Sequence, residues 1–283
     1  MITAIRQSDN KKVLGNVIVK NPSESYRCDY CEKNVIHHKS DSEIKIGHFK
    51  HKSGESDCPN QKTGESVYHY NAKYDIYKYI TTNWGDKLKT IEVEKWLLNK
   101  TIRSDIYIET KKNKIAIEVQ ANILTVSEIR DRTEKYTANN IYVLWILPYN
   151  YRNFYEYKLD LENNYDWILK DKVRFKEMEI FLYWSNNQRL FFWDLGHKYF
   201  DSFVCAFFKE YKNNDVEFKR YGEEHFYTGK TAKTIKTPSW DIEVSFNKMI
   251  VKDYPKINAK NRPYIIPDRK IFTYENNYEK SKS

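Results

Sequence analysis

The chain has 283 residues, which at roughly 100–200 residues per domain is enough for one or two globular domains. Hydrophobic residues make up 40% and aromatic residues 16% of the chain, which excludes the disordered proteins of low hydrophobicity. Lysine and arginine exceed aspartate and glutamate by 48 to 39, but the resulting charge of +9 is spread along the chain and does not by itself indicate nucleic acid. The longest apolar run, 141–147, is too short to span a membrane, and residues 1–20 lack the apolar block of a signal peptide. These features predict a soluble, cytoplasmic protein.

The first 62 residues contain a group of potential metal ligands. They are Cys28, Cys31, Cys58, His37, His38, His48 and His51. The two-residue gap of Cys28-x-x-Cys31 allows both thiolates to bind one tetrahedral ion, and four nitrogen or sulfur ligands complete a structural zinc site. We predict Cys28, Cys31 and Cys58 as three of the ligands. The fourth is His51, or alternatively His48, because residues three apart on a strand face opposite sides. The other interpretation is a set of buried free thiols beside surface histidines.

From residue 63 the pattern changes to helix, three strands, helix and strand. Thr63-Gly64-Glu65 is typical of a helix start, and residues 111–113 are typical of a turn between two strands. The predicted helices are 63–80 and 125–139, and the predicted strands are 91–98, 101–109, 114–120 and 141–147. This αβββαβ order predicts a mixed α+β core.

Charged side chains share one face of the predicted hairpin 101–120. If its loop holds an even number of residues, Asp105 lies opposite Glu118 or Gln120, with Arg103 on the same face. Two converging carboxylates repel each other unless a cation lies between them, and a divalent metal is the simplest such cation. A bound metal polarises a phosphate oxygen and lowers the pKa of its water, as phosphodiester hydrolysis requires. The alternative is a structural ion pair between Arg103 and Glu118 on a solvated sheet face.

Both predicted helices carry polar stripes. Glu65, His69 and Lys73 are spaced i, i+4, i+8 on one face of the first helix, and Glu65 offers the metal a third carboxylate. The alternative is a first-turn glutamate favoured by the helix dipole, with a solvated histidine and lysine beneath it. Arg132 and Tyr136 share one face of the second helix, where they either hold a phosphate or support the sheet.

These motifs, in this order, closely resemble the competence protein CoiA-like family. The motifs are Cys28-x-x-Cys31, His48-Phe-x-His51, Cys58, Glu65-Ser66-x-x-His69-x-x-x-Lys73, Arg103-Ser-Asp105, Ile117-Glu118-Val-Gln120, Arg132-Thr-x-x-Tyr136 and Val143-Leu-Trp145-Ile-Leu147. The resemblance covers roughly residues 1–150. It implies a zinc-finger-like segment at 1–62, a PD-(D/E)XK nuclease-like domain with a restriction-endonuclease-like core at 63–150, and an α/β extension with a basic tail at 151–283.

The resemblance also implies roles for individual residues. Asp105 corresponds to the metal-binding aspartate, Glu118 to the acid of the (D/E)XK strand, and Glu65 to the acid on the first helix. The Val119 carbonyl completes this set of magnesium ligands. Gln120 stands where the wider superfamily usually has lysine, so one positive charge is missing. We hypothesise that Lys73 replaces it.

The second half of the chain is less informative. Residues 150–214 are rich in aromatic side chains, which we expect to be core rather than a base-stacking surface. Strands are predicted at 178–184 and 189–195, around a turn at 185–188, and a helix at 200–209. Residues 215–283 hold 14 basic and 10 acidic residues and several prolines, which predicts an extended basic segment.

The resemblance implies a deoxyribonuclease that uses Mg²⁺ or Mn²⁺ to hydrolyse phosphodiester bonds, in DNA uptake and recombination or in defence against foreign DNA. The alternative is a non-catalytic DNA-binding or recombination-assisting protein that keeps the nuclease fold. Strand preference, a homo-oligomeric state and recombination or defence partners are left open. The residues expected to contact DNA are Arg103, His69, Arg132 and Tyr136.

Overall fold

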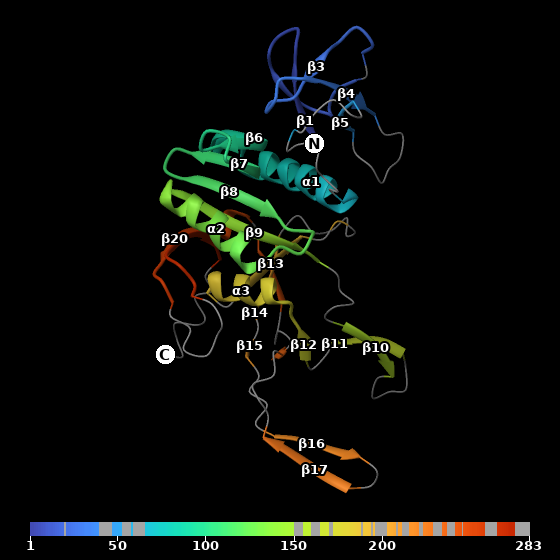
Figure 1. Ribbon diagram of the computed structural model, residues 1–283, viewed down its shortest axis with the longest axis vertical. Coiled ribbons are helices and arrows are strands. Elements are labelled where there is room, and N and C mark those ends of the chain that lie inside the picture. Colours follow the sequence, from blue (N-terminus) through green and yellow to red (C-terminus); the bar gives the residue numbers. More distant parts are fainter. Residues whose placement is uncertain are drawn as a thin grey trace.

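The computed structural model describes most of the chain. The described ranges are 1–19, 21–39, 47–52, 58, 66–149, 155–159, 165–169, 172–187, 189–193, 195, 203–207, 209–210, 215–220, 223–228, 234–236, 241–244, 246–257 and 265–274. A small N-terminal sheet lies next to a larger central sheet that has helices on both faces (Figure 1). Among the helices described, none is long and apolar enough to cross a lipid bilayer.

The N-terminal sheet has five strands in the order β2-β1-β3-β4-β5. The strands are β1 (Thr3–Arg6), β2 (Lys12–Leu14), β3 (Tyr26–Arg27), β4 (Asn34–His38) and β5 (His48–His51). Gly15 and Gly47 meet backbone to backbone, and a Cβ on Gly15 would lie 2.7 Å from the Gly47 oxygen. A larger residue at either position would therefore push β2 and β5 apart.

The elements predicted between residues 63 and 150 occur in the predicted order. They are α1 (Val67–Trp84), β6 (Leu88–Leu97), β7 (Ile102–Thr110), β8 (Lys114–Val119), α2 (Val126–Ala138) and β9 (Ile141–Pro148). Strands β6, β7 and β8 pair antiparallel, whereas β8 and β9 pair parallel. The predicted helix start at 63–65 lies outside the described residues, and α1 continues beyond its predicted end at Ile80.

Alternating side chains divide the central sheet into two buried faces. On one face, Ile106, Ile117 and Ile146 pack with residues of α1 such as Ile76 and Ile80. On the other face, Tyr107, Ala116 and Trp145 pack with residues of α2 and α3 (Glu177–Ser185). The two-residue period of the strands explains this division, because successive side chains point to opposite faces.

Strands from the second half of the chain extend the central sheet. In the described residues it has nine strands, with the path β19-β14-β13-β9-β8-β7-β6 and with β21 pairing both β20 and β9. The remaining elements are η1 (Gly85–Lys87), β10 (Tyr155–Leu159), β11 (Tyr165–Leu169), β12 (Lys172–Arg174), β13 (Arg189–Trp193), β14 (Phe203–Phe207), β15 (Lys209–Glu210), β16 (Asp215–Arg220), β17 (Glu223–Thr228), β18 (Thr234–Lys236), β19 (Asp241–Val244), η3 (Phe246–Lys248), β20 (Ile250–Tyr254) and β21 (Arg269–Thr273).

Two of the predicted elements in this half are wrong. The strand expected at 178–184 is the helix α3, whose N-terminus is capped by the Glu179 carboxylate accepting the backbone N–H of Lys176 at 2.7 Å. Where a helix is expected at 200–209, the described residues form the strands β14 and β15. Strand β14 pairs antiparallel with β13. Short apolar runs without polar interruptions carry no periodicity, so partners in the fold decide between helix and strand.

Candidate functional site

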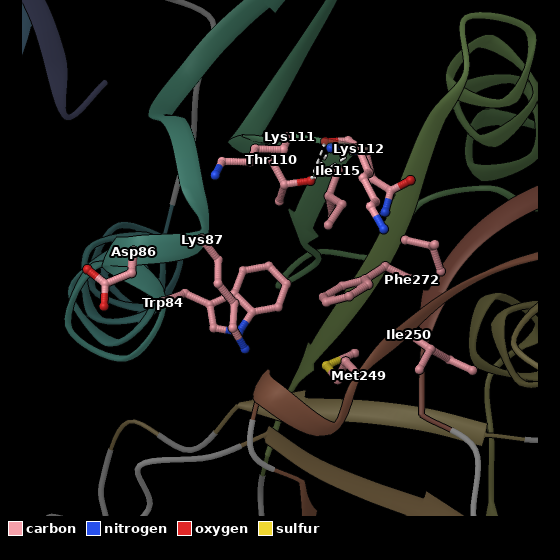
Figure 2. Close-up of a pocket in the computed structure, with 12 residues that line it drawn as sticks. Trp84, Asp86, Lys87, Thr110, Lys111, Lys112, Ile115, Met249, Ile250 and Phe272 are labelled. Atoms are coloured by element: carbon pink, nitrogen blue, oxygen red, sulfur yellow. Dashed lines mark hydrogen bonds between the residues drawn. The ribbon is translucent and has the colours of Figure 1, made fainter.

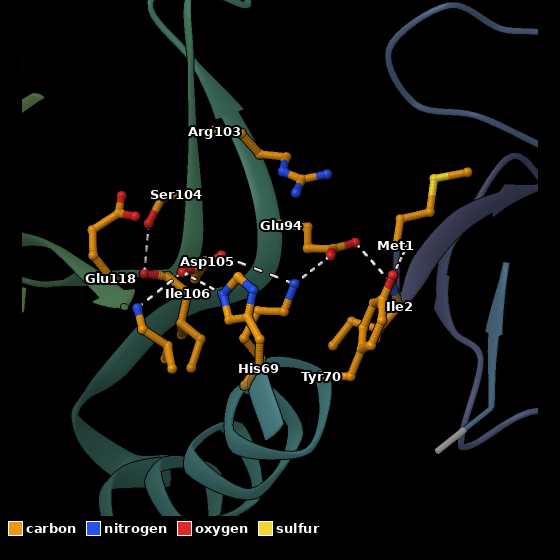
Figure 3. Close-up of polar contacts among 12 residues, drawn as sticks. Met1, Ile2, His69, Tyr70, Glu94, Arg103, Ser104, Asp105, Ile106 and Glu118 are labelled. Carbon is orange, nitrogen blue, oxygen red and sulfur yellow. Dashed lines mark hydrogen bonds and ion pairs between the residues drawn. The ribbon is translucent and has the colours of Figure 1, made fainter. Parts of the chain in front are cut away.

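Asp105 and Glu118 lie side by side where β7 and β8 separate. The pairing of Ile106 with Ile117 is the last in the ladder, and one more step places Asp105 opposite Glu118. Instead of continuing the ladder, the Val119 backbone N–H donates to Asp105 Oδ2 at 2.9 Å. The predicted register is confirmed, but the two side chains contact different helices. Figure 3 shows Asp105 beside His69 of α1, whereas Glu118 contacts Arg132 and Tyr136 of α2, which covers the other face of the sheet.

Two residues of α1 contact Asp105. His69 Nε2 lies 3.0 Å from Oδ2, and Lys73 Nζ lies 3.9 Å from Oδ1. The Ser66 hydroxyl fixes this end of the helix by accepting the His69 backbone N–H at 3.2 Å. Burial raises the pKa of Asp105, but His69, Lys73 and the Val119 N–H outweigh that effect, so its pKa lies well below the usual range. Asp105 is therefore ionised at neutral pH.

Glu118 is held by two residues of α2. Arg132 donates to Oε2 at 2.5 Å and the Tyr136 hydroxyl donates to Oε1. Burial raises the pKa of Glu118 and the charge of Asp105 adds to this, although Arg132 opposes both effects. The ion pair of Glu118 is thus with Arg132 and not with Arg103, the partner in the alternative interpretation. The Arg103 guanidinium lies 5.9 Å from the centre of the Trp96 ring.

Three further residues were predicted to belong to this site: Gln120, Glu65 and Lys73. The Gln120 side-chain amide donates to the Asn122 carbonyl, within its own loop. Glu65 lies outside the described residues. Lys73 is fully buried, and its closest carboxylate partner is Glu94 at 2.6 Å rather than Asp105.

Glu94 is a buried residue that sequence reasoning missed. Its side chain is 2% exposed, and its Oε2 accepts the backbone N–H groups of Ile2 and Thr3 at 2.9 and 3.2 Å. In an alternating strand Glu94 would lie on the same face as Glu92, but its φ of +52° interrupts the alternation. Glu94 thereby joins the N-terminal sheet to Lys73 and, through it, to Asp105 (Figure 3).

The acid dependence of stability should report on this Glu94–Lys73 pair. Burial raises the pKa of Glu94, but the positive charges of Lys73 and Arg103 outweigh this effect, so its pKa lies well below the ordinary value of 4.5. A lowered pKa stabilises the fold above the ordinary value, and this contribution is lost as the pH falls. Between about pH 5 and pH 3, we expect urea unfolding to show a steeper loss of stability in the wild type than in Glu94→Gln. Equal slopes would contradict this assignment.

The second group of ligands lies at the edge of the N-terminal sheet. The potential ligand atoms of Cys28, Cys31, His51 and Cys58 all lie within 4.8 Å of one another. The sulfur atoms of Cys28 and Cys58 are 3.8 Å apart, and a tetrahedral ion with zinc–sulfur bonds of about 2.3 Å separates two sulfurs by roughly 3.8 Å. Of the two predicted histidines, His51 belongs to this group, with Nε2 3.2 Å from the Cys31 sulfur. This cluster can bind a metal such as zinc.

The turn that carries Cys28 and Cys31 suits a metal site, whereas His48 contacts other aromatic rings. The Cys28 sulfur accepts the Tyr30 backbone N–H at 3.4 Å, and Glu32, just after Cys31, has a φ of +62° that reverses the chain. The His48 ring stacks between those of His38 and Tyr70, at 5.5 and 5.9 Å. Within the residues described, no other group of three or more His, Cys, Asp and Glu ligands is as closely spaced.

Comparison with known proteins shows the family of the chain. Residues 65–225, more than half of the chain, match the family model described as "Competence protein CoiA, nuclease-like domain". The chain belongs to this family. The matched region includes α1, both carboxylate-bearing strands and α2, so the resemblance to the CoiA-like family is confirmed for the motifs from Glu65 onward.

A curated relative supports the same membership. The chain is 26% identical over 106 residues to the protein named "Competence protein CoiA" of Bacillus subtilis (strain 168). This match covers 38% of the chain and 27% of the relative, so it spans little more than a quarter of the relative's length. No solved structure matches the chain.

Proposed function

We propose that this CoiA-family protein is a metal-dependent DNA nuclease of the PD-(D/E)XK type, with a restriction-endonuclease-like αβββαβ core. The observation that carries the proposal is the pair Asp105 and Glu118, which extend from neighbouring strands at the point where these separate. Cytoplasmic DNA, single- or double-stranded, is the proposed substrate. DNA uptake and recombination or defence against foreign DNA is the proposed setting.

Oxygen donors suitable for a hard cation are present at this site. The carboxylates of Asp105 and Glu118 with the Val119 carbonyl would hold Mg²⁺ or Mn²⁺, and Glu65 would assist. When bound, the metal supplies Lewis-acid activation of a phosphate oxygen and a water. Both carboxylates already face cationic or hydrogen-bonding partners, so the metal must compete with Lys73 for Asp105 and with Arg132 for Glu118.

The chain's own residues would provide the remaining contributions. Lys73, buried and near Asp105, would supply the positive charge that Gln120 lacks. Arg132, whose side chain is 32% exposed although its Nε is buried, would contact a phosphate, and Arg103 and His69 would add DNA contacts. Tyr136 was expected to contact DNA as well, but it is fully buried and holds Glu118 instead. The cluster of Cys28, Cys31, His51 and Cys58 would hold a structural zinc ion. The proposed partners are a second copy of the protein and recombination or defence proteins.

A non-catalytic DNA-binding role is the second candidate. It is favoured by the same contacts, because His69 and Lys73 face Asp105 while Arg132 and Tyr136 hold Glu118, so both carboxylates have partners within the protein. In this case the two carboxylates would serve as structural anchors for α1 and α2. DNA binding would then persist without cleavage.

Cleavage assays distinguish the two candidates. We expect the wild type to cut single- or double-stranded DNA in Mg²⁺ or Mn²⁺, and Glu118→Ala to cut at least about a hundredfold more slowly, because a metal ligand is lost. Glu109→Ala, which removes a partly exposed carboxylate from the end of the same strand as Asp105, should cut at the wild-type rate.

The metal-free control reaction should omit Mg²⁺ rather than add a chelator, because a chelator would also remove metal from the cysteine cluster. DNA retardation on a gel without cutting by any variant would establish the non-catalytic role. Equal cutting by the wild type and Glu118→Ala would show that the centre lies elsewhere.

A further inference from the structure

The β6–β7 hairpin contacts the segment from Cys28 to Cys31, which we call the cysteine turn. The ring of Tyr30, in this turn, packs against Trp96 of β6, with ring centroids 4.5 Å apart and planes inclined at 46°. Lys100, between β6 and β7, donates to the Tyr30 carbonyl at 2.8 Å, and its Nζ lies 5.5 Å from the centre of the Tyr30 ring. These contacts connect the cysteine turn to the central sheet.

The turn between β6 and β7 has an uncommon backbone. Leu98, Asn99 and Lys100 all have positive φ, at 51°, 53° and 63°. Four-residue hairpin loops are most often built around a type I turn, whose φ values are negative, and a left-handed conformation is costly for a residue with a Cβ. The Thr101 backbone N–H secures the turn by donating to the Leu97 carbonyl at 3.2 Å. The position of Lys100 is thus maintained at a conformational cost, and such segments cluster at functional sites.

A series of contacts leads from this hairpin to the two carboxylates. The Arg103 guanidinium lies over the Trp96 ring, and the Arg103 carbonyl accepts a hydrogen bond from Arg132 at 3.0 Å. Arg132 is in turn paired with Glu118. Along β7, Arg103 is two residues from Asp105, about 7 Å at about 3.3 Å per residue, and Figure 3 shows both residues on this strand. The surface of the hairpin is therefore continuous with the proposed nuclease centre.

Positive charge is available on this surface. Lys100 is exposed, and among the described residues no carboxylate pairs with it. Asp29, the acidic residue of the cysteine turn, is already paired with Lys12 at 3.0 Å, and Glu94 is buried in its own ion pair. Because the Lys100 ammonium donates to a neutral carbonyl, its charge is not compensated within the protein. An anionic ligand can therefore supply the missing negative charge.

We propose that Tyr30, Trp96, Lys100 and Arg103 form a surface that binds the sugar–phosphate backbone of a DNA strand beside the nuclease centre. Arg103 contacts a phosphate close to the cut, and Lys100 contacts a phosphate farther along the strand, at the cysteine turn. Each of the two cations lies over an aromatic ring, which restrains it before DNA arrives and lowers the entropy cost of binding. The proposal rests on the proposed function, because it takes the carboxylate pair as the point of cleavage.

The salt dependence of DNA binding tests this surface. Fluorescence anisotropy of a labelled single-stranded oligonucleotide, in KCl without added Mg²⁺, gives the slope of log K against log[KCl]. Each phosphate contact contributes about 0.7 to the size of this slope for a single strand and about 0.9 for a duplex. We expect Lys100→Gln to reduce the slope by about 0.7 on a single strand, and Lys100→Arg, which keeps the charge, to retain the wild-type slope. A decrease seen only with a duplex of the same sequence would identify a strand of the duplex as the ligand.

Lys111→Gln is the matched control. Lys111 is an exposed lysine in the turn between β7 and β8, at the other end of β7 (Figure 2). Strand β7 has nine residues, about 30 Å at about 3.3 Å per residue, so Lys111 lies far from Lys100. This variant should keep the wild-type slope. Elemental analysis should find the wild-type metal content in all three variants, because a DNA contact, unlike a structural support of the cysteine turn, does not affect metal binding.

Several results would overturn the proposal. They are no DNA binding by the wild type, equal slopes in the wild type and Lys100→Gln, an equal decrease in Lys111→Gln, or loss of metal from Lys100→Gln. Cleavage by these variants and by Glu118→Ala reports separately on the nuclease. A smaller slope in Lys100→Gln without cleavage by any protein supports the surface and contradicts the nuclease. Cleavage that Glu118→Ala abolishes, with an unchanged slope in Lys100→Gln, supports the nuclease and contradicts the surface.

Discussion

Loss of metal from the cysteine–histidine cluster is expected to unfold the N-terminal sheet. The sheet has only a small core of its own, and the ligands come from the β3–β4 turn, from β5 and from Cys58, so one ion connects three separate parts of the chain. In small domains structural zinc contributes about 10–16 kcal/mol of apparent binding free energy at neutral pH, and that energy is also folding energy. We expect His51→Asn to lose one equivalent of zinc and to lose the hydrogen-exchange protection of strands β1 to β5.

His48→Asn is the matched control for this prediction. His48 is on the same strand but stacks on His38 and Tyr70, so this variant should keep its zinc. Elemental analysis of both purified variants measures the metal directly. Zinc retained by His51→Asn but lost by His48→Asn would reverse the ligand assignment. A metal-free protein with wild-type exchange protection would refute the structural role of the ion.

Replacing Glu94 with alanine is expected to lower the free energy of unfolding by about 3–5 kcal/mol. The substitution leaves the Lys73 ammonium fully buried without its closest counter-charge, and it removes the acceptor of the Ile2 and Thr3 backbone N–H groups. A buried charge without a partner is costly, and each buried donor that loses its acceptor adds to the cost. Urea unfolding of the two proteins at neutral pH measures the difference.

A double-mutant cycle separates the ion pair from the other contacts of Glu94. Lys73→Met combined with Glu94→Ala should be less destabilised than the sum of the two single variants, because the second substitution removes the unpaired charge. Glu92→Ala, with a carboxylate 37% exposed that pairs with Lys95, should change stability by no more than about 1 kcal/mol. Additive losses, or a Glu94→Ala variant as stable as Glu92→Ala, would show that the pair does not hold the N-terminal sheet against α1.

The interior of the site could be predicted only in part. The position of Asp105 near Glu118 was predictable because a hairpin with a short loop has few registers. That the two side chains contact different helices was not predictable from the strands alone. The partner of Glu118 was not predictable either, because α2 begins seven residues beyond β8 and its rotation over the sheet depends on packing. The sequence offered Arg103 as the ion-pair partner of Glu118, and only the position of α2 shows that Arg132 takes this role.

What the amino-acid sequence determined by itself is local or nearly so. The Cys28-x-x-Cys31 spacing, the helix of His69 and Lys73, and the order of elements from α1 to β9 all follow from periodicity and short loops. The tertiary structure decided the burial of Glu94, its ion pair with Lys73 and the helical state of residues 177–185. These features bring together residues that are far apart in the chain. Short-range sequence patterns do not encode these contacts, because the packing of the whole fold determines which distant segments meet.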